Sequence, residues 1–281
     1  MPALSLVVCL HRERDLLARL LRETSGCYND LVVVHDGEEA PDAPISEMVA
    51  RDAGRFFVRP RAWQQEPHWP FAWSQARYDW ILRLDADEVP SAGLRTWLQS
   101  FRKADQPPQS ISGYSCIWPL WDGRKIVTEK WPAGRVFLFN KQRVRFFGMV
   151  EQIPVADQRW EALPLILEHR PLRKSFGPGN VLLRRQAYDW RRVIAQSLLG
   201  KPTDLPHWRW ESESWPEVWE QIRRRPLQTA LHRLFVWPLR ALRNIWREER
   251  KFIPLAAMSG GIHHCLIALN YWRMAHSEKR R

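Results

Sequence analysis

The sequence lacks the short motifs by which several large enzyme classes are recognised. It contains no GxxxxGK[ST] phosphate loop, no GxGxxG after an apolar run, no HExxH and no GxSxG. These absences weigh against P-loop NTPases, dinucleotide-dependent dehydrogenases, zincins and serine hydrolases. They do not exclude nucleotidyl transfer, which can use an α/β sheet and a metal ion without any of these motifs.

Cysteine is scarce. The chain has four cysteines, Cys9, Cys27, Cys116 and Cys265, and no CxxC pair, a pattern typical of unpaired thiols in a reducing compartment. No signal peptide is recognisable, because the apolar stretch at 4–10 is short, lacks a basic segment before it and runs into charged sequence. We therefore expect a cytoplasmic protein.

Negative charge is in deficit. Asp and Glu number 31 against 43 Lys and Arg, for a formal net charge of +12. Residues 216–281 hold 13 Lys and Arg against 5 Asp and Glu, so the excess lies mostly in the last quarter of the chain. A basic surface attracts nucleic acid, anionic membrane or phosphorylated substrates, and charge alone does not choose among them.

What the sequence does contain is an alternation of apolar runs and amphipathic segments. Buried strands are predicted over 4–10, 30–37 and 80–85, with a shorter strand over 55–60. Helices are predicted over 12–26, around 43–53, from about residue 71 and over 91–103. This alternation predicts an α/β fold with a parallel sheet that is covered by helices on both faces.

The pattern changes after residue 110. Short β-rich segments separated by turn residues predict an antiparallel extension of the sheet, and a further strand is predicted over 163–171. From residue 182 onward the chain is predicted to be mainly helical. The fold class is therefore a mixed sheet flanked by helices, with a helical C-terminal appendage.

Polar side chains follow two of the predicted parallel strands. His35 and Asp36 end the second strand, and Asp85, Asp87 and Glu88 follow the strand over 80–85. Ligands of such sheets bind beyond the carboxyl ends of the strands. Two carboxylates in a D-x-D pair can reach one Mg²⁺ or Mn²⁺ ion, which would stabilise charge on a leaving diphosphate. The alternative is a solvated acidic turn; the strand context favours the metal site.

Five segments occur in the order found in family 2 glycosyltransferases of the GT-A fold: LSLVVCLHRERDLLARLL, LVVVHDG, WILRLDADE, RVFLFNKQRVRFFGMVEQ and LEHRPLRKSF. Over residues 4–190 the chain resembles the bacterial lipopolysaccharide-core branch of that family. The resemblance implies a GT-A type, Rossmann-like sheet, a nucleotide-sugar donor (a UDP-sugar is expected), a divalent metal, and inversion at the anomeric carbon by a single displacement.

Roles at the donor are implied by the same resemblance. Asp85 and Asp87 would hold the metal and the diphosphate, and Asp36, with His35, would contact the donor base or ribose. Arg135 lies two residues before the position of the family's phosphate-contacting arginine, on the same strand face, and is expected to meet the donor phosphate.

Two further roles concern chemistry and metal binding. Glu151, which follows a valine where the family has histidine, is the expected general base that takes the proton of the acceptor hydroxyl. His169 would ligate the metal or the donor phosphate; the alternative for a lone histidine is a structural hydrogen-bonding role. Glu88 either orients the sugar or the acceptor or supports the acids beside it. Trp118 either stacks on a sugar ring or fills a core.

The C-terminal region is basic and aromatic. A helical apolar stripe is predicted from Leu227, Leu231, Leu234, Leu242 and Ile245, with arginines alternating beside it. Residues 252–272 carry no charge, but a proline, two glycines and two histidines argue against a membrane span. We expect helices that lie on the inner face of the cytoplasmic membrane. A helical subdomain packed on the sheet is the alternative, and nucleic acid is not an expected partner because no reading module is present.

These expectations combine into one hypothesis. Residues 1–175 form the catalytic domain, with a nucleotide-sugar half at about 1–90 and an acceptor half at about 91–175, and residues 176–281 form the helical region. The protein transfers a sugar to a lipopolysaccharide core or another lipid-linked saccharide. Two alternatives stay open: a nucleotidyltransferase on a similar fold, and a non-catalytic membrane- or saccharide-binding relative.

Overall fold

The computed structural model describes most of the chain, namely residues 2–62, 64–105, 109–119, 134–146, 154–170, 185–200, 217–247 and 254–278. The chain divides into two compact units, residues 1–172 and 173–281. The boundary expected at residue 175 falls among residues 171–184, outside the described residues. The two units are described separately.

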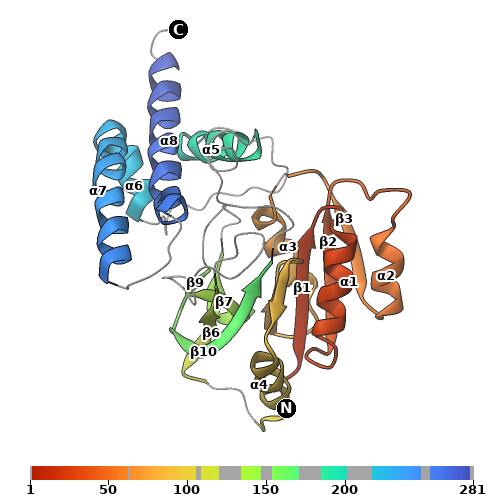
Figure 1. Ribbon diagram of the computed structural model, residues 1–281. Helices are drawn as coiled ribbons and strands as arrows, with labels where there is room; N and C mark the ends of the chain where they lie inside the picture. The colour runs from red at the N-terminus through yellow and green to blue at the C-terminus, as the bar shows by residue number, and fades with distance from the viewer. Residues whose placement is uncertain are drawn as a thin grey trace. The chain divides into compact units, whose positions relative to one another are not determined.

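Unit 1 is built on an eight-stranded mixed sheet with the order β3-β2-β1-β4-β7-β6-β10-β5 (Figure 1). Four strands form its parallel half, in which β1 pairs with β2 and β4, and β2 pairs with β3. These strands are β1 (Leu4–Leu10), β2 (Asp30–Asp36), β3 (Arg55–Arg59) and β4 (Trp80–Arg83). The buried apolar runs of the sequence therefore form the parallel strands, as expected of strands covered on both faces.

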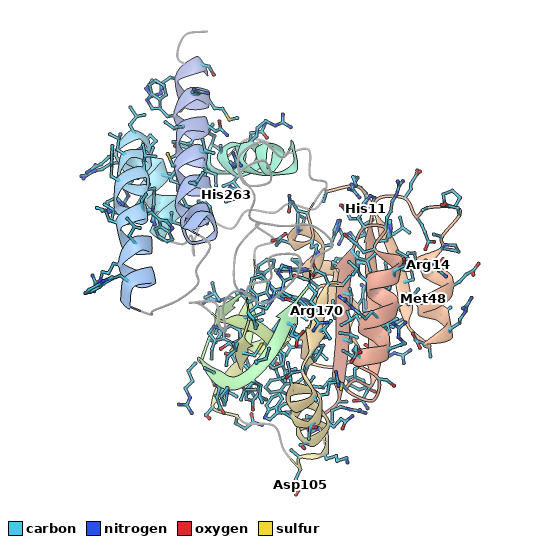
Figure 2. The ribbon with its side chains drawn as sticks, viewed as in Figure 1. His11, Arg14, Met48, Asp105, Arg170 and His263 are labelled. Atoms are coloured by element: carbon cyan, nitrogen blue, oxygen red, sulfur yellow. The ribbon has the colours of Figure 1, made fainter. Side chains whose placement is uncertain are left out.

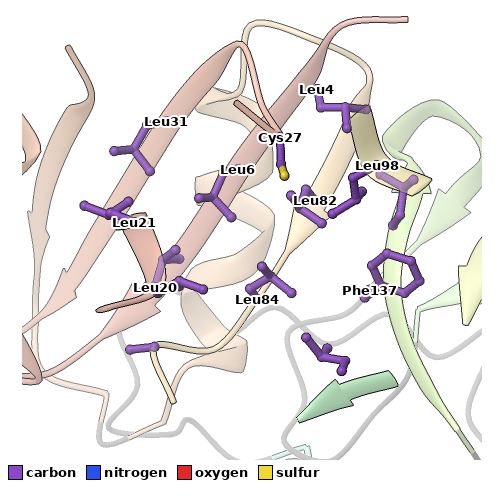
Figure 3. Close-up of a cluster of buried hydrophobic side chains, with 14 of the residues drawn as sticks. Leu4, Leu6, Leu20, Leu21, Cys27, Leu31, Leu82, Leu84, Leu98 and Phe137 are labelled. Atoms are coloured by element: carbon purple, nitrogen blue, oxygen red, sulfur yellow. The ribbon is translucent and has the colours of Figure 1, made fainter. Parts of the chain in front are cut away.

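Helices cover both faces of this sheet. They are α1 (Arg14–Glu23), α2 (Ile45–Arg51), α3 (Trp69–Gln75, preceded by the 3-10 turn Glu66–His68) and α4 (Ala92–Lys103). One core joins β1 and β4 to α1 and α4; it includes Leu6, Leu20, Leu82 and Leu98 (Figure 3). A second core on the opposite face joins Val7 and other strand residues to Trp69 and Trp73 of α3. The predicted α/β class, a mixed sheet flanked by helices, is confirmed.

The second half of the sheet differs in part from expectation. β7 (Arg135–Asn140) runs antiparallel to β4 and to β6 (Ile111–Ile117), as predicted. The last long strand, β10 (Arg159–His169), begins earlier than predicted and pairs parallel with β6. The C-terminal end of β10 pairs antiparallel with the three-residue β5 (Glu88–Pro90). The short 3-10 turn Lys141–Arg143 leads into β8 (Val144–Arg145), which forms a separate two-stranded sheet with β9 (Val155–Ala156).

Unit 2 is helical in its described residues, as predicted from residue 182 onward. Its helices are α5 (Arg185–Leu198), α6 (Glu217–Arg224), α7 (Pro226–Arg247) and α8 (Pro254–Glu278). Among the helices that the structure describes, none combines the length and apolarity needed to cross a membrane. The apolar stripe predicted on α7 is present and is exposed at Leu227, Leu231, Leu234 and Leu242. The side chain of Ile245 lies outside the described part.

Candidate functional site

The carboxyl ends of the parallel strands bring the predicted polar residues to one edge of the sheet. β1, β2 and β3 run in the same direction (Figure 1), and β4 is parallel to β1. The strands therefore end at one edge of the sheet, with the last residues Leu10, Asp36, Arg59 and Arg83. His11, the next residue after β1, is labelled there in Figure 2. Two groups of charged side chains lie at this edge, one after β4 and one after β2.

The first group is the acid turn, which we define as residues 85–88. The turn is closed by two hydrogen bonds: the Glu88 N–H donates to the Asp85 carbonyl at 3.0 Å, and the Asp85 N–H donates to Glu88 Oε2 at 2.8 Å. Glu88 is wholly buried and begins β5, where it pairs with His169 of β10. The turn is thereby fixed to a strand that occurs much later in the sequence.

A single arginine neutralises two of these acids. Arg135, the first residue of β7, forms an ion pair with Asp85, and its Nε lies 2.8 Å from Glu88 Oε1. Burial on its own would lower the pKa of Arg135, but the charges of Asp85 and Glu88 outweigh burial and raise it. For Glu88 burial dominates, and the pKa of this carboxyl is raised even though Arg135 acts to lower it. The crowded acids are thus tolerated in part because the protein supplies its own cation.

The third acid has a different partner. Asp87 Oδ2 lies 3.2 Å from Nε2 of His169, and the Asp87 carbonyl accepts the N–H of Arg170 at 2.8 Å. Burial acts to raise the pKa of Asp87, but the hydrogen bond and charge of His169 lower it overall. Burial likewise acts to lower the pKa of His169, but the bond to Asp87 and the surrounding carboxylates raise it. The ion pair therefore stabilises both charged forms.

Trp118 connects the two halves of the acid turn. Its ring stacks on His169 with 4.4 Å between centroids and 23° between planes, and its Nε1–H donates to Glu88 Oε1 at 3.0 Å. The Arg135 guanidinium lies 5.4 Å from the centroid of the same ring. Trp118 is also partly buried against the main apolar core, so the structure bears out the core-packing role, and stacking on a sugar ring stays a prediction.

The acids differ in their access to solvent, which bears on metal binding. The side chains of Asp85 and Asp87 are 20% and 23% exposed, whereas Glu88 is 0% exposed. No group of three or more His, Cys, Asp or Glu side chains within the described residues has the arrangement of a metal site. Mg²⁺ and Mn²⁺, however, are commonly held by one or two carboxylates together with waters and substrate phosphates. Asp85 and Asp87 supply two partly exposed carboxylates of this kind, and their binding of a metal stays a prediction.

The second group surrounds Asp36 at the end of β2. Its Oδ1 accepts hydrogen bonds from the Ala62 N–H at 2.5 Å and from His68 Nε2 at 2.9 Å, and Arg61 Nε lies 3.4 Å from Oδ2. Burial acts to raise the pKa of Asp36, but the bonds from His68 and Ala62 and the charge of Arg61 lower it overall. Asp36 is therefore a buried anion that fixes the segment after β3.

His35 has both ring nitrogens engaged with the backbone. Its Nε2 accepts the Arg12 N–H at 3.2 Å, so its Nδ1 carries the proton and donates to the Gly37 carbonyl at 2.8 Å. Arg12 and Gly37 both have positive φ, at 61° and 87°, a backbone conformation that residues other than glycine seldom adopt. His35 thus ties two tight turns together. A contact between His35 and a donor stays a prediction, and a hydrogen bond to the donor from either ring nitrogen would replace one of these two bonds.

Glu13 is a half-buried acid near both groups that the sequence patterns do not single out. Burial raises the pKa of Glu13, and Asp87 and Asp85 raise it further while Arg61 lowers it, so the carboxyl lies within electrostatic reach of both groups. Its Oε2 accepts the His11 N–H at 2.6 Å. The charged stretch HRER directly after the first strand is the sequence signal for this position, but the amphipathic pattern predicts a helix over 12–26, whereas α1 begins at Arg14 and leaves Glu13 before the helix.

Arg83 is a buried cation next to the acid turn that was also missed. It is 4% exposed, its Nη2 donates to the Val136 carbonyl at 3.0 Å, and its guanidinium lies 4.2 Å from the Trp69 ring centroid. Burial first and the charge of Arg135 second lower the pKa of Arg83 to about 10. In the sequence, the only sign of a buried cation beside the acid turn is that the apolar run at 80–85 contains an arginine.

The structure thus brings Asp85, Asp87, Glu88, Arg135 and His169 together, and it places Asp36 and His35 at the end of β2, which β1 separates from β4. The proposed general base, Glu151, lies outside the described residues. Its contribution to the site therefore stays a prediction.

No family model and no curated protein sequence matches the chain. Solved structures with partial likeness include the mannosyltransferase PcManGT from Pyrobaculum calidifontis in complex with GDP-Man and Mn²⁺, at 12% identity and a TM-score of 0.47, covering 97% of this chain and 88% of that one. A mycobacterial protein is 14% identical with a TM-score of 0.45, and the match covers 72% of this chain and 76% of that one. Residues 1–349 of S. aureus TarS are 13% identical with a TM-score of 0.38, and the match covers 73% of this chain and 68% of that one. None of the three TM-scores reaches 0.5, so the functional argument rests on the chain's own residues.

Proposed function

We propose that the protein is a metal-dependent glycosyltransferase that moves a sugar from a nucleotide-sugar donor to a saccharide acceptor. The observation that carries the proposal is the placement of two partly exposed carboxylates, Asp85 and Asp87, at the carboxyl edge of parallel strands, with the buried anion Asp36 at the same edge, at the end of β2, two strands away from β4. This edge is where α/β sheets bind nucleotides. A UDP-sugar donor, inversion at the anomeric carbon and a lipopolysaccharide-core or other lipid-linked acceptor complete the proposal and follow from the resemblance stated above.

The charge balance of the acid turn supports a bound dication. The turn carries three formal negative charges, and the cations paired with it among the described residues are Arg135 and His169, whose pKa the bond to Asp87 raises despite its burial, so one formal negative charge is left over. Asp85 and Asp87 would hold the ion, which would neutralise charge on the departing nucleoside diphosphate. Glu88, being wholly buried, would not touch the ion; it fixes the backbone of the turn and the position of Arg135.

The chain's own residues have separable roles in this proposal. Arg135 sets the orientation of Asp85, and His169 sets that of Asp87. Trp118 holds the His169 ring by stacking and Glu88 by a hydrogen bond, so it positions both halves of the turn. Glu151 would accept the proton of the acceptor hydroxyl as the C–O bond to the sugar forms and the bond to the diphosphate breaks.

The direct test is a thermal-shift screen of nucleotide-sugars with and without Mn²⁺, because a ligand that binds the folded state raises its apparent stability. The wild type should show a shift that needs both components, and Asp85→Asn and Asp87→Asn should lose it. Asp79→Asn is the matched control, since Asp79 lies just before the opposite end of β4 and contacts only Gln142 among the side-chain partners described. Undiminished binding and turnover in both site variants would refute the assignment.

The released product separates this proposal from its main rival. A glycosyltransferase releases a nucleoside diphosphate, whereas a nucleotidyltransferase with the same metal releases pyrophosphate from an NTP. Detection of pyrophosphate would replace the proposal with nucleotidyl transfer. A protein that binds no nucleotide-sugar in the presence of Mn²⁺ would instead be a non-catalytic relative.

A further inference from the structure

Helix α7 carries a continuous apolar face that is exposed to solvent. Large apolar side chains exposed by 43–83% recur along its whole length: Leu227, Leu231, Leu234, Phe235, Leu239, Leu242 and Trp246. At about 100° per residue they fall within roughly 140° of the helix circumference. Isolated exposed leucines are ordinary, but a contiguous patch of this kind marks an interaction surface. We call these seven residues the α7 face.

Helix α7 cannot turn its apolar face toward the rest of unit 2, because the opposite side of the helix already packs against α8 and α6. A methyl group added at Gly261 of α8 would collide with the Trp237 ring, so the two helices meet at a glycine with no room to spare. Ala230 and Thr229 are buried on the same inner side, and the Thr229 hydroxyl donates to the Gln221 carbonyl of α6 at 3.0 Å. The apolar face is therefore turned away from the described helices of its own unit.

The charge around this face is strongly positive. Residues 217–247 contain seven arginines against two glutamates. One of the two, Glu220, is already paired with Arg224 at 2.7 Å and with Arg223 at 3.4 Å. Arg243, one residue beyond Leu242, is exposed. A second copy of this chain would bring another basic helix against the first, so like-charge repulsion opposes self-association through this face.

We infer that the α7 face docks on an anionic phospholipid bilayer, with its apolar side chains in the boundary between headgroups and acyl chains and the neighbouring arginines at the level of the lipid phosphates. Interfacial helices bind through this combination of an apolar face and basic flanks, and Trp246, the most exposed member, suits the headgroup region. The inference goes beyond the proposed glycosyl transfer, because it concerns unit 2 and requires no donor, acceptor or metal.

Vesicle co-sedimentation of the full chain tests this inference. Vesicles of phosphatidylethanolamine with phosphatidylglycerol should carry down the wild type, and vesicles of phosphatidylcholine alone should carry down much less. The double variant Leu231→Ser with Leu242→Ser should bind the anionic vesicles about tenfold or more weakly, because two large apolar side chains are lost from the boundary region. Val58→Ser is the matched control: Val58 is also a half-exposed apolar residue, but it lies on the edge strand β3. It should bind like the wild type.

Three outcomes would overturn the inference. The first is equal binding of the double variant and the wild type to anionic vesicles. The second is equal binding of the wild type to both kinds of vesicle, which would remove the role of charge. The third is a wild-type dimer in solution that the double variant abolishes without any vesicle binding, since a second copy would then cover the face. Because the readout is sedimentation, a failure here is independent of a failure in the nucleotide-sugar screen.

Discussion

Replacing Arg135 by glutamine should reveal how much of the stability of unit 1 depends on the acid turn. Arg135 is one cation facing two acids, the wholly buried Glu88 and the partly exposed Asp85. Glutamine keeps a similar length and can donate hydrogen bonds, but it removes the positive charge. The variant therefore leaves Glu88 as a buried carboxylate whose remaining described partners are the Trp118 N–H and the Asp85 N–H.

The expected magnitude follows from the burial of the ion pair. Removing one partner of a buried ion pair costs about 3–5 kcal/mol, because the remaining charge is left without compensation in a region of low polarity. Glu88 also gains a way to reduce this cost: without Arg135 its pKa should rise further and the carboxyl can take up a proton. We therefore expect a loss near the lower end of this range, about 3 kcal/mol at neutral pH.

Urea denaturation followed by circular dichroism measures this loss as a change in the unfolding free energy. The matched control is Arg51→Gln, which breaks the surface pair between Arg51 and Glu47, whose side chains are 74% and 67% exposed. That variant should lose less than about 0.5 kcal/mol. A loss below about 1 kcal/mol for Arg135→Gln would contradict the reasoning, because it would mean that solvent or backbone compensates Glu88 as well as the arginine does.

A double-mutant cycle with Glu88→Gln sharpens the test. If the cost arises from an unpaired buried charge, the two substitutions together should destabilise by clearly less than the sum of their separate effects. Strict additivity would show that Arg135 and Glu88 act independently, and it would remove the ion pair as the explanation.

Three further predictions concern other parts of the chain. Gly113→Ala should destabilise unit 1 by about 2 kcal/mol or more in denaturant melts, because the added methyl would approach the Phe139 Cα to 2.7 Å. The control Gly93→Ala in α4 should be neutral or slightly stabilising, because the nearest atom to its added methyl lies at 3.5 Å. Burial, followed by the charges of Arg233 and His263, lowers the pKa of His264 to about 4. As the pH falls from 6.5 to 4, His264 therefore takes up a proton in the unfolded chain but stays largely neutral in the folded protein. Stability of unit 2 should fall over that window by at most about 3 kcal/mol from this residue, and His264→Gln should flatten the measured pH slope; an unchanged slope would contradict it. Glu151→Gln should reduce turnover at least about a hundredfold while leaving donor binding intact, and normal turnover would move the base elsewhere.

The buried half of the fold was predictable because its strands are apolar on both faces. The runs at 4–10 and 30–37 became β1 and β2 with nearly the predicted bounds, since no solvent-facing residues interrupt them. β10 was less predictable: its first residues are partly exposed and include charged side chains, which conceal a strand in the sequence. Its parallel pairing with β6 depends on contacts between distant segments, which no local pattern records.

The candidate site divides in the same way. The position of Asp85 and Asp87 followed from a strand ending in acids, and their place at the same edge of the sheet as Asp36 followed from the shared direction of the strands. Their partners could not be predicted locally, because Arg135 and His169 arrive on β7 and β10. The stack of Trp118 on His169 joins a residue just beyond β6 to the end of β10, and tryptophan is equally suited to an apolar core.

The pairing of β5 with β10 has a consequence for the order of synthesis. A nascent chain that ends before residue 159 already holds the four parallel strands and both aspartates, yet it has no β10 to hold Glu88 in register and no histidine to orient Asp87. The geometry of the acid turn therefore forms only once the ribosome has added β10, although the residues proposed to bind metal were made far earlier. Contacts that join such distant segments close late, since the entropy of the intervening loop must be lost first.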